Sequence, residues 1–270
     1  MLKKRVITAL CGLPVLVAAI WFDTPLPWFT VLGAIWGLLA AVEFYRISAV
    51  SKALPLFCFG LLWTLFFIVS PHFDFIFIVP LLITSAVVLS MVFLVFLPQK
   101  EGAFTTWVWT IAGILYVGWL LSVLVALRLD AGRNWVFYAL LTTFASDIAA
   151  FFVGRAVGRH YLAPQISPRK TWEGAVAGVL GAVIVSLLFT LPTPLNLPMS
   201  YGQAVWLGLL VSVFGQFGDL AESLLKRSRG MKESGNLMPG HGGLLDRMDS
   251  VVFAGVVVYY FWLASTAGWL

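Results

Sequence analysis

The stretch from Phe75 to Leu97 reads FIFIVPLLITSAVVLSMVFLVFL and contains no charged side chain. A helix needs about 20 mainly apolar residues to cross the hydrocarbon core of a bilayer, and irregular backbone cannot face lipid. The stretch therefore predicts a transmembrane helix. The rest of the chain has the same character, since 61% of its 270 residues are hydrophobic and 11% are charged. An ordinary soluble domain has about 25% charged residues, so we predict an all-α, polytopic transmembrane helical bundle.

Eight further apolar runs are long enough to cross a bilayer, which gives about nine predicted spans. They are expected at residues 6–22, 26–42, 53–70, 75–97, 104–127, 135–153, 172–191, 203–222 and 250–269. With the N-terminus in the cytoplasm, only Arg128 and Arg133 of the 17 basic residues lie outside. This asymmetry follows the positive-inside rule and predicts a multi-pass protein of the inner (cell) membrane. Basic loops beside the anionic leaflet also explain the net charge of +5, so we expect no nucleic acid as a partner.

Charged residues are concentrated in the second half of the chain. Two predicted cytoplasmic loops, residues 154–171 and 223–249, are longer than the others and carry most of the charge. We therefore expect residues 131–270 to form a catalytic transmembrane region with these two loops and an active site that faces the cytoplasm. Residues 1–130 are expected to supply N-terminal helices for packing, with an apolar surface available for an oligomer.

Acidic side chains gather at the predicted cytoplasmic ends of the later spans. They are Asp147, Glu173, Asp219, Glu222, Asp246 and Asp249. Carboxylates in or beside a span are costly in lipid, so they usually face a bundle interior or a water-filled cavity and mark function. Asp219, Glu222, Ser223 and Lys226 follow at three- and four-residue spacing and share a helical face. Such carboxylates on neighbouring helices can hold one or two hard cations, with substrate phosphates completing the shell.

The alternative for these carboxylates is simple ion pairing with Lys226, Arg227 and Arg247. Pairing explains a single acid, but it leaves the whole interleaved set of acids and bases without a reason. Gly242–Gly243 precede the predicted last helix, where free backbone amides and the positive helix end attract anions. Three roles stay open for His241, which could be a proton carrier, an anion donor or a loop histidine.

Several stretches between residues 146 and 250 combine polar residues at fixed spacing. They read SDIAAFFVGR (146–155), SPRKTWEG (167–174), QFGDLAE (216–222), SLLKR (223–227), KE (232–233) and PGHGGLLDRMD (239–249). Together they resemble the signature of phosphatidate cytidylyltransferases, also called CDP-diacylglycerol synthases. Two positions depart from that family's usual pattern. Glu233 stands where aspartate is usual, and Met238 stands where a branched or aromatic residue is usual.

The resemblance implies a reaction of CTP with phosphatidic acid that gives CDP-diacylglycerol and pyrophosphate and uses a divalent cation. We predict that Asp219 and Asp246, helped by Asp249, hold Mg²⁺, with room for a second cation. The predicted catalytic set is completed by Lys226, Arg227 and Arg247, which would steady the pyrophosphate, and by His241. The predicted substrate-binding residues are Ser167, Lys170, Thr171, Glu173, Asp147, Glu222, Ser223, Gly242 and Gly243. On the resemblance alone, a homodimer is expected.

Two other functions are compatible with charged side chains beside spans. A CTP-dependent polyprenol or lipid kinase would use a lipid alcohol in place of the lipid phosphate. An ion-coupled transporter also places acids in the membrane, although its site usually lies near the midplane between inverted repeats, and the sequence shows no repeat. Because CTP arrives from water and acyl chains stay in the bilayer, we expect a polar pocket with one opening to the cytoplasm and another to lipid.

Overall fold

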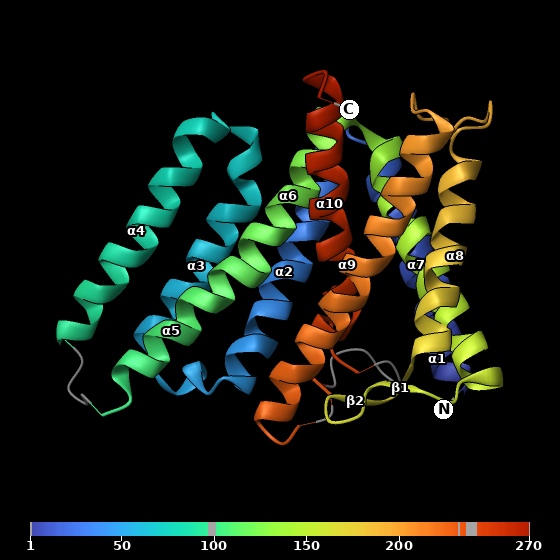
Figure 1. Ribbon diagram of the computed structural model, residues 1–270. Helices are drawn as coiled ribbons and strands as arrows, with labels where there is room; N and C mark the ends of the chain where they lie inside the picture. Colours follow the sequence, from blue (N-terminus) through green and yellow to red (C-terminus); the bar gives the residue numbers. More distant parts are fainter. Residues whose placement is uncertain (1, 97–100, 232, 236–241, 270) are drawn as a thin grey trace. The chain divides into compact units, whose positions relative to one another are not determined.

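The computed structural model describes the chain apart from residues 1, 97–100, 232, 236–241 and 270 (Figure 1). The chain forms two compact units. The first contains residues 1–129 and 229–246, and the second contains residues 130–228 and 247–270. Residues 229–246, the signature segment, therefore belong with the N-terminal helices, although they lie in the sequence between two helices of the second unit.

The first unit is built mainly from helices. Its elements are α1 (Leu2–Trp21), α2 (Trp28–Ile47), η1 (Val50–Lys52), α3 (Leu54–Val69), η2 (Ser70–His72), α4 (Phe75–Phe96), α5 (Ala103–Gly113), η3 (Ile114–Trp119), α6 (Leu120–Ala126) and η4 (Leu127–Ala131). The last four follow one another without a break, so residues 103–131 form one long helix with two π-helical segments. The buried core of the first unit includes Phe59, Phe67, Leu82, Ala86 and Ile114.

The second unit combines four helices with a short β-ribbon. Its elements are α7 (Arg133–Val157), β1 (Tyr161–Ala163), β2 (Ser167–Thr171), α8 (Trp172–Leu188), α9 (Tyr201–Ser228) and α10 (Asp249–Thr266). The short η5 (Leu245–Arg247) precedes α10 in the chain and includes the last two residues of the first unit. The two strands pair antiparallel, with Tyr161 opposite Thr171 and Ala163 opposite Ser167. The ribbon thus joins the end of α7 to the start of α8.

Glycines let α7 and α8 pack closely. A Cβ added at Gly174 would lie 2.7 Å from the carbonyl oxygen of Ala150, and one added at Gly181 would lie 3.0 Å from the carbonyl oxygen of Ala145. Small residues allow this approach between membrane helices, whose association depends on packing and interhelical hydrogen bonds. The Oγ atoms of Ser146 and Ser212 lie 2.7 Å apart and link α7 to α9. These contacts fix the position of Asp147, which follows Ser146 on α7.

The prediction of an all-α membrane protein with several spans is confirmed. Within the described residues, seven helices are long and apolar enough to cross a membrane, and they lie at residues 28–47, 54–72, 77–96, 103–131, 133–157, 201–228 and 249–266. The span predicted at residues 172–191 corresponds to the shorter apolar helix α8 at residues 172–188. The span predicted at residues 6–22 lies on α1 (Leu2–Trp21). The count of nine spans therefore stays a prediction.

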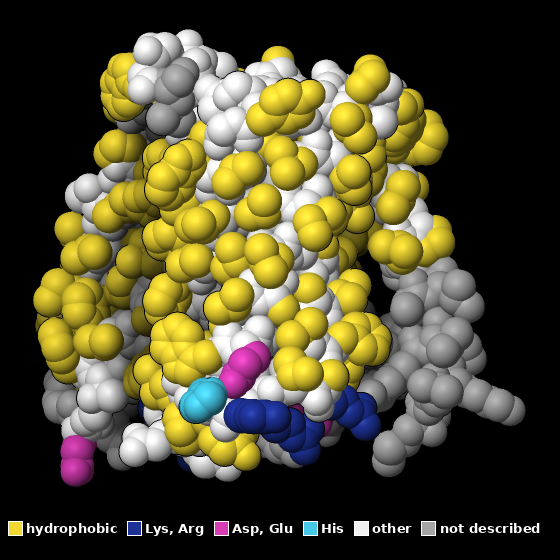
Figure 2. All heavy atoms as spheres, turned by 45° about the vertical axis from the view of Figure 1, so that its right-hand side comes forward, with side chains coloured by type: hydrophobic (Ala, Val, Ile, Leu, Met, Phe, Trp, Pro, Cys, Tyr) yellow, Lys and Arg dark blue, Asp and Glu magenta, His cyan; other side chains and the backbone are white. Residues whose placement is uncertain are grey.

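On one face of the molecule, charged and apolar side chains are separated. Figure 2 shows Lys, Arg, Asp, Glu and His side chains at one end of a face that is otherwise covered largely by hydrophobic side chains. On α7 and α8 the large exposed apolar side chains include Ile148, Phe151, Phe152, Val176, Leu180 and Ile184. Large exposed apolar surfaces are unusual in soluble proteins and suit helices that face lipid.

Two predicted boundaries were wrong, both at the long charged loops. α9 continues to Ser228, beyond the predicted end of the span at Glu222. The helical face expected for Ser223 and Lys226 is therefore formed, and Arg227 also lies on the helix. Cationic side chains in a last turn interact favourably with the negative end of the helix dipole, and this helix extends beyond its apolar part. The predicted loop at residues 154–171 contains the end of α7 and the β-ribbon, because a short polar ribbon leaves no mark on hydropathy.

Candidate active site

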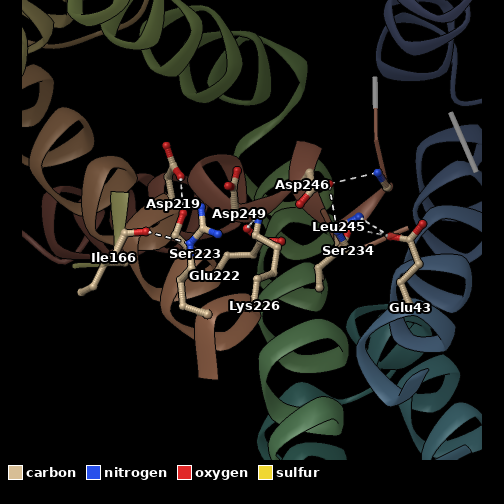
Figure 3. A network of polar contacts seen from close by, with 12 residues as sticks. Glu43, Ile166, Asp219, Glu222, Ser223, Lys226, Ser234, Leu245, Asp246 and Asp249 are labelled. Atoms are coloured by element: carbon tan, nitrogen blue, oxygen red, sulfur yellow. Dashed lines mark hydrogen bonds and ion pairs between the residues drawn. The ribbon is translucent and has the colours of Figure 1, made fainter. Parts of the chain in front are cut away.

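Asp219 on α9 brings three predicted site residues of the second unit together. Its Oδ2 lies 2.7 Å from Nζ of Lys170, which comes from β2. Its Oδ1 accepts a hydrogen bond of 3.3 Å from Oγ of Ser223, one turn further along α9 (Figure 3). The ion pair therefore connects the β-ribbon to α9.

Two more carboxylates lie close enough to Asp219 for their charges to repel it. They are Asp147 on α7 and Asp249 at the first position of α10, and the charges of Lys170 and Lys226 also act on this group. Like charges gathered in a partly buried place are unfavourable unless cations neutralise them. We call these five residues the charge cluster. Four separate elements deliver it, which makes it a product of the tertiary fold.

Gly218 allows the carboxylates of α9 and α10 to lie close together. A Cβ at this position would collide with the carbonyl oxygen of Asp249 and would lie 2.9 Å from Cδ2 of Phe253. Asp249 Oδ1 also accepts a 2.7 Å hydrogen bond from the backbone amide of Ser250. The first turn of α10 thus holds Asp249 in place, and the absent side chain of Gly218 lets Asp219 approach it.

Lys226 forms an ion pair with Glu222, one turn earlier on α9. The side chain of Glu222 is fully buried, and that of Lys226 is 12% exposed. Lys226, which we predict to steady the pyrophosphate, therefore also neutralises a buried carboxylate.

Replacement of Glu222 by Gln is expected to lower the free energy of unfolding by about 3 kcal/mol, because it leaves the buried Lys226 ammonium without its carboxylate. Thermal unfolding of the purified protein in detergent measures the loss. The double variant Glu222→Gln/Lys226→Met removes both charges and should recover most of the stability. Equal stability of the single and double variants would show that the pair carries no such energy.

The ribbon residues of the predicted site have structural partners. Oγ1 of Thr171 accepts a 3.2 Å hydrogen bond from the amide of Gly174 and caps α8. Glu173 Oε1 lies 2.6 Å from Nδ1 of His160. These contacts hold the start of α8 against the ribbon.

The turn of the ribbon is held from α9. Arg227 Nε donates a 3.3 Å hydrogen bond to the carbonyl oxygen of Ile166 (Figure 3). Ser167 follows directly and begins β2, three residues before Lys170. The predicted substrate-binding stretch is thus fixed at both of its ends, by Arg227 and by the Lys170–Asp219 ion pair.

Asp246 lies in the signature segment, and backbone amides hold it. Its Oδ2 accepts hydrogen bonds from the amides of Gly243 at 3.0 Å and Ser234 at 3.2 Å (Figure 3). Gly242 has a φ of +83°, a conformation that glycine adopts without strain. The two glycines predicted to bind substrate phosphate thus belong to the turn that grips Asp246.

Arg247 and His241 are the remaining residues of the predicted catalytic set. Arg247 is exposed and opens the second unit's last segment. His241 lies outside the residues that the structure describes. Asp219 and Asp246 belong to different units, so a cation shared by these two stays a prediction.

Sequence reasoning missed Glu43. This residue lies on α2, one position beyond the predicted end of the second span, and it is 1% exposed. Its Oε2 accepts hydrogen bonds from Oγ of Ser234 at 3.1 Å and from the amide of Leu245 at 2.9 Å. The rule that acids beside spans mark function would have found it if applied to the first half of the chain.

A metal centre made by protein ligands alone is not formed by the described residues, because no three His, Cys, Asp or Glu side chains among them are arranged to hold an ion. Mg²⁺ usually keeps several waters and is bound by one or two carboxylates plus substrate phosphates. The mutually repelling oxygens of Asp147, Asp219 and Asp249 fit that kind of binding.

Comparison with known proteins decides the family. A family model described as "Cytidylyltransferase family" matches residues 3–264. The chain belongs to the cytidylyltransferase family. The predicted resemblance is therefore confirmed, and so is the prediction of a nucleotidyltransferase.

Individual relatives agree with this family. A phosphatidate cytidylyltransferase of Bacillus subtilis is 33% identical over 274 residues, which cover 96% of this chain and 97% of the relative. A phosphatidate cytidylyltransferase of Brucella suis is 44% identical over 155 residues, 57% of this chain and 56% of the relative. The uncharacterized protein YnbB of Escherichia coli is 39% identical over 166 residues, 62% of this chain and 54% of the relative. The aligned part thus spans about half the length of the last two.

Proposed function

We propose that this cytidylyltransferase transfers the cytidylyl group of CTP to phosphatidate, forming CDP-diacylglycerol and pyrophosphate for phospholipid biosynthesis. Relatives named phosphatidate cytidylyltransferase support the choice of lipid substrate. The observation that carries the proposal is the charge cluster, in which three carboxylates and two lysines from four elements meet beside helices suited to a membrane. Such a place can receive phosphates and stay next to lipid.

The chemistry joins two anions, so charge must be neutralised. An oxygen of the phosphatidate phosphate attacks the α-phosphorus of CTP, and the bond from that phosphorus to the pyrophosphate oxygen breaks in line with it. A phosphate monoester is a competent nucleophile once it is oriented, so no covalent enzyme intermediate is needed. Lys170, Lys226 and Arg227, with Arg247, supply positive charge for the phosphates. Ser167, Thr171 and Ser223 offer hydroxyl groups for orienting them.

Mg²⁺ is part of this proposal. Asp219 and Asp249, with Asp147 beside them, would hold it within the second unit, and Asp246 is the further ligand that the sequence predicts. The bound ion would neutralise phosphate charge and favour departure of pyrophosphate. Lys170 keeps Asp219 partly neutralised in its ion pair and would yield that charge to the phosphates when they arrive.

The arrangement in the membrane completes the proposal. We place nine spans in the inner membrane, with a cytoplasmic N-terminus and an active site open to the cytoplasm, where CTP is found. The distribution of basic residues supports this orientation. Residues 131–270 would hold the catalytic region, and the apolar helices of residues 1–130 would serve for packing and as the surface of a homodimer.

Labelled CTP tests the reaction class. Purified protein in detergent with phosphatidate and Mg²⁺ is expected to move label from the α-phosphate of CTP into lipid and to leave γ-label in pyrophosphate. Transfer of γ-label to a polyprenol or other lipid alcohol would instead indicate a lipid kinase. Absence of label from lipid with every substrate would contradict both enzymes and favour a transporter.

A further inference from the structure

Glu43 stands at a rigid end of α2. Two residues further along the helix, the buried hydroxyl of Tyr45 donates a 3.1 Å hydrogen bond to the carbonyl oxygen of Thr110. Gly60 makes room for this ring, since a Cβ there would lie 2.5 Å from Oη of Tyr45. The end of α2 is therefore firmly packed within the first unit, and the backbone position of Glu43 is fixed.

The carboxylate of Glu43 connects α2 to a part of the chain that is remote in sequence. Its hydrogen-bond donors, Ser234 and Leu245, are 191 and 202 residues away, and both belong to the signature segment (Figure 3). One buried oxygen thus joins two points of this segment.

The same two points hold Asp246. Ser234 gives its hydroxyl to Glu43 and its backbone amide to Oδ2 of Asp246. Leu245, whose amide is bound by Glu43, directly precedes Asp246 in the chain. Glu43 therefore restrains Asp246 from both sides, through one hydrogen-bond donor and through the adjacent backbone.

Glycines of the segment are shaped around the Glu43 carboxylate. A Cβ at Gly243 would collide with Ser234 Oγ and Glu43 Oε2, and a Cβ at Gly235 would lie 2.6 Å from Glu43 Oε1. Larger residues at either position would push the segment off the carboxylate. Gly235 and Gly243 therefore pack directly against the Glu43 carboxylate, although they lie far from it in the sequence.

We infer that Glu43 is a positioning residue that holds Asp246 in place for the cytidylyl transfer, an inference that rests on the proposed function. Glu43 need not touch either substrate to do this. A buried carboxyl group without hydrogen bonds is costly, so its bonds to Ser234 and Leu245 stabilise the position of the segment.

Replacement of Glu43 by Met, which keeps the length and removes both acceptors, is expected to lower kcat about 10- to 100-fold, as loss of a group that orients a ligand typically does. Glu43→Gln keeps one acceptor oxygen and should recover part of the loss. Hydrogen exchange of the nucleotide-free protein should become faster over residues 242–246 in Glu43→Met, because the Leu245 amide loses its acceptor. Asp130→Asn, which removes a carboxylate bound by Tyr259 at 2.8 Å, is the control and should change neither measurement.

Unchanged exchange over residues 242–246 together with a normal kcat would overturn the inference, and so would faster exchange without loss of kcat. If Glu43→Met does not fold, Ser234→Ala removes only the hydroxyl that Glu43 binds and must change both measurements in the same direction. Exchange is measured without nucleotide. It therefore reports whether Glu43 restrains residues 242–246 even if the wild-type protein does not catalyse the proposed reaction.

Discussion

Asn in place of Asp219 is expected to lower kcat for transfer of α-label from CTP to phosphatidate by at least about a thousand-fold, while the protein stays folded. The Asp219 carboxylate lies at the centre of the charge cluster and binds both Lys170 and Ser223. Groups that neutralise phosphoryl charge contribute several kcal/mol at the transition state, and each 1.36 kcal/mol is about tenfold in rate. Removing a charge that repels Asp147 and Asp249 offsets the loss of the ion pair, so unfolding should change little.

The measurement uses purified protein at saturating substrates, with thermal unfolding recorded on the same samples. Glu101→Gln makes a similar chemical change at an exposed acid in the described part of the chain and should keep wild-type turnover. A folded Asp219→Asn enzyme with near-normal turnover would refute the role assigned to this carboxylate. A variant that binds Mn²⁺ as well as the wild type would refute its part in holding the cation.

Ala in place of Gly218 is expected to lower kcat at least about a hundred-fold and to lower the free energy of unfolding by about 2 kcal/mol. The added Cβ meets the backbone oxygen of Asp249 and the ring of Phe253. A backbone atom cannot turn aside as the end of a flexible side chain can, so α9 and α10 must move apart. That movement separates Asp219 from Asp249, and a misplacement of about 1 Å can cost a hundred-fold in rate.

Gly215 provides the matched control, because it lies nearly one turn earlier on the same helix. A Cβ there would have its nearest neighbour at 3.6 Å, the carbonyl oxygen of Ser250, which is ordinary contact. Gly215→Ala should therefore keep turnover and gain some stability, since Ala is favoured over Gly in a helix by about 1 kcal/mol. Equal behaviour of the two variants in kcat would show that the close approach at Gly218 has no part in the reaction.

Much of the fold was predictable from hydropathy, because lipid imposes a simple rule on length and composition. Long apolar runs at residues 28–47 and 77–96 are helices, as expected. The rule gives no information where a helix leaves the apolar layer. The predicted span ended at Glu222 for that reason, whereas α9 continues through Lys226 and Arg227 to Ser228. The β-ribbon that carries Lys170 is too short and too polar to have been predicted in the same way.

The candidate site was predictable in its residue types and less so in its partners. Spacing on one helix predicted that Asp219 and Ser223 share a face, and a hydrogen bond joins them. The partnership of Lys170 with Asp219 joins positions 49 residues apart on different elements, and no local pattern specifies it. Glu43 was not predicted because it is a lone acid beside its span, whereas the acids of the later spans recur at helical spacing.

The amino-acid sequence alone determined that the chain lives in a membrane, that it is helical, and that residues 146–250 carry a cytidylyltransferase signature. These properties depend on composition and on short spacings, which are local and additive along the chain. Only the tertiary structure decided which charges meet. It placed Asp147, Asp219 and Asp249 within reach of one another and gave Asp246 to Glu43 and Ser234, because such contacts are set by how closely helices pack at positions such as Gly218 and Gly243.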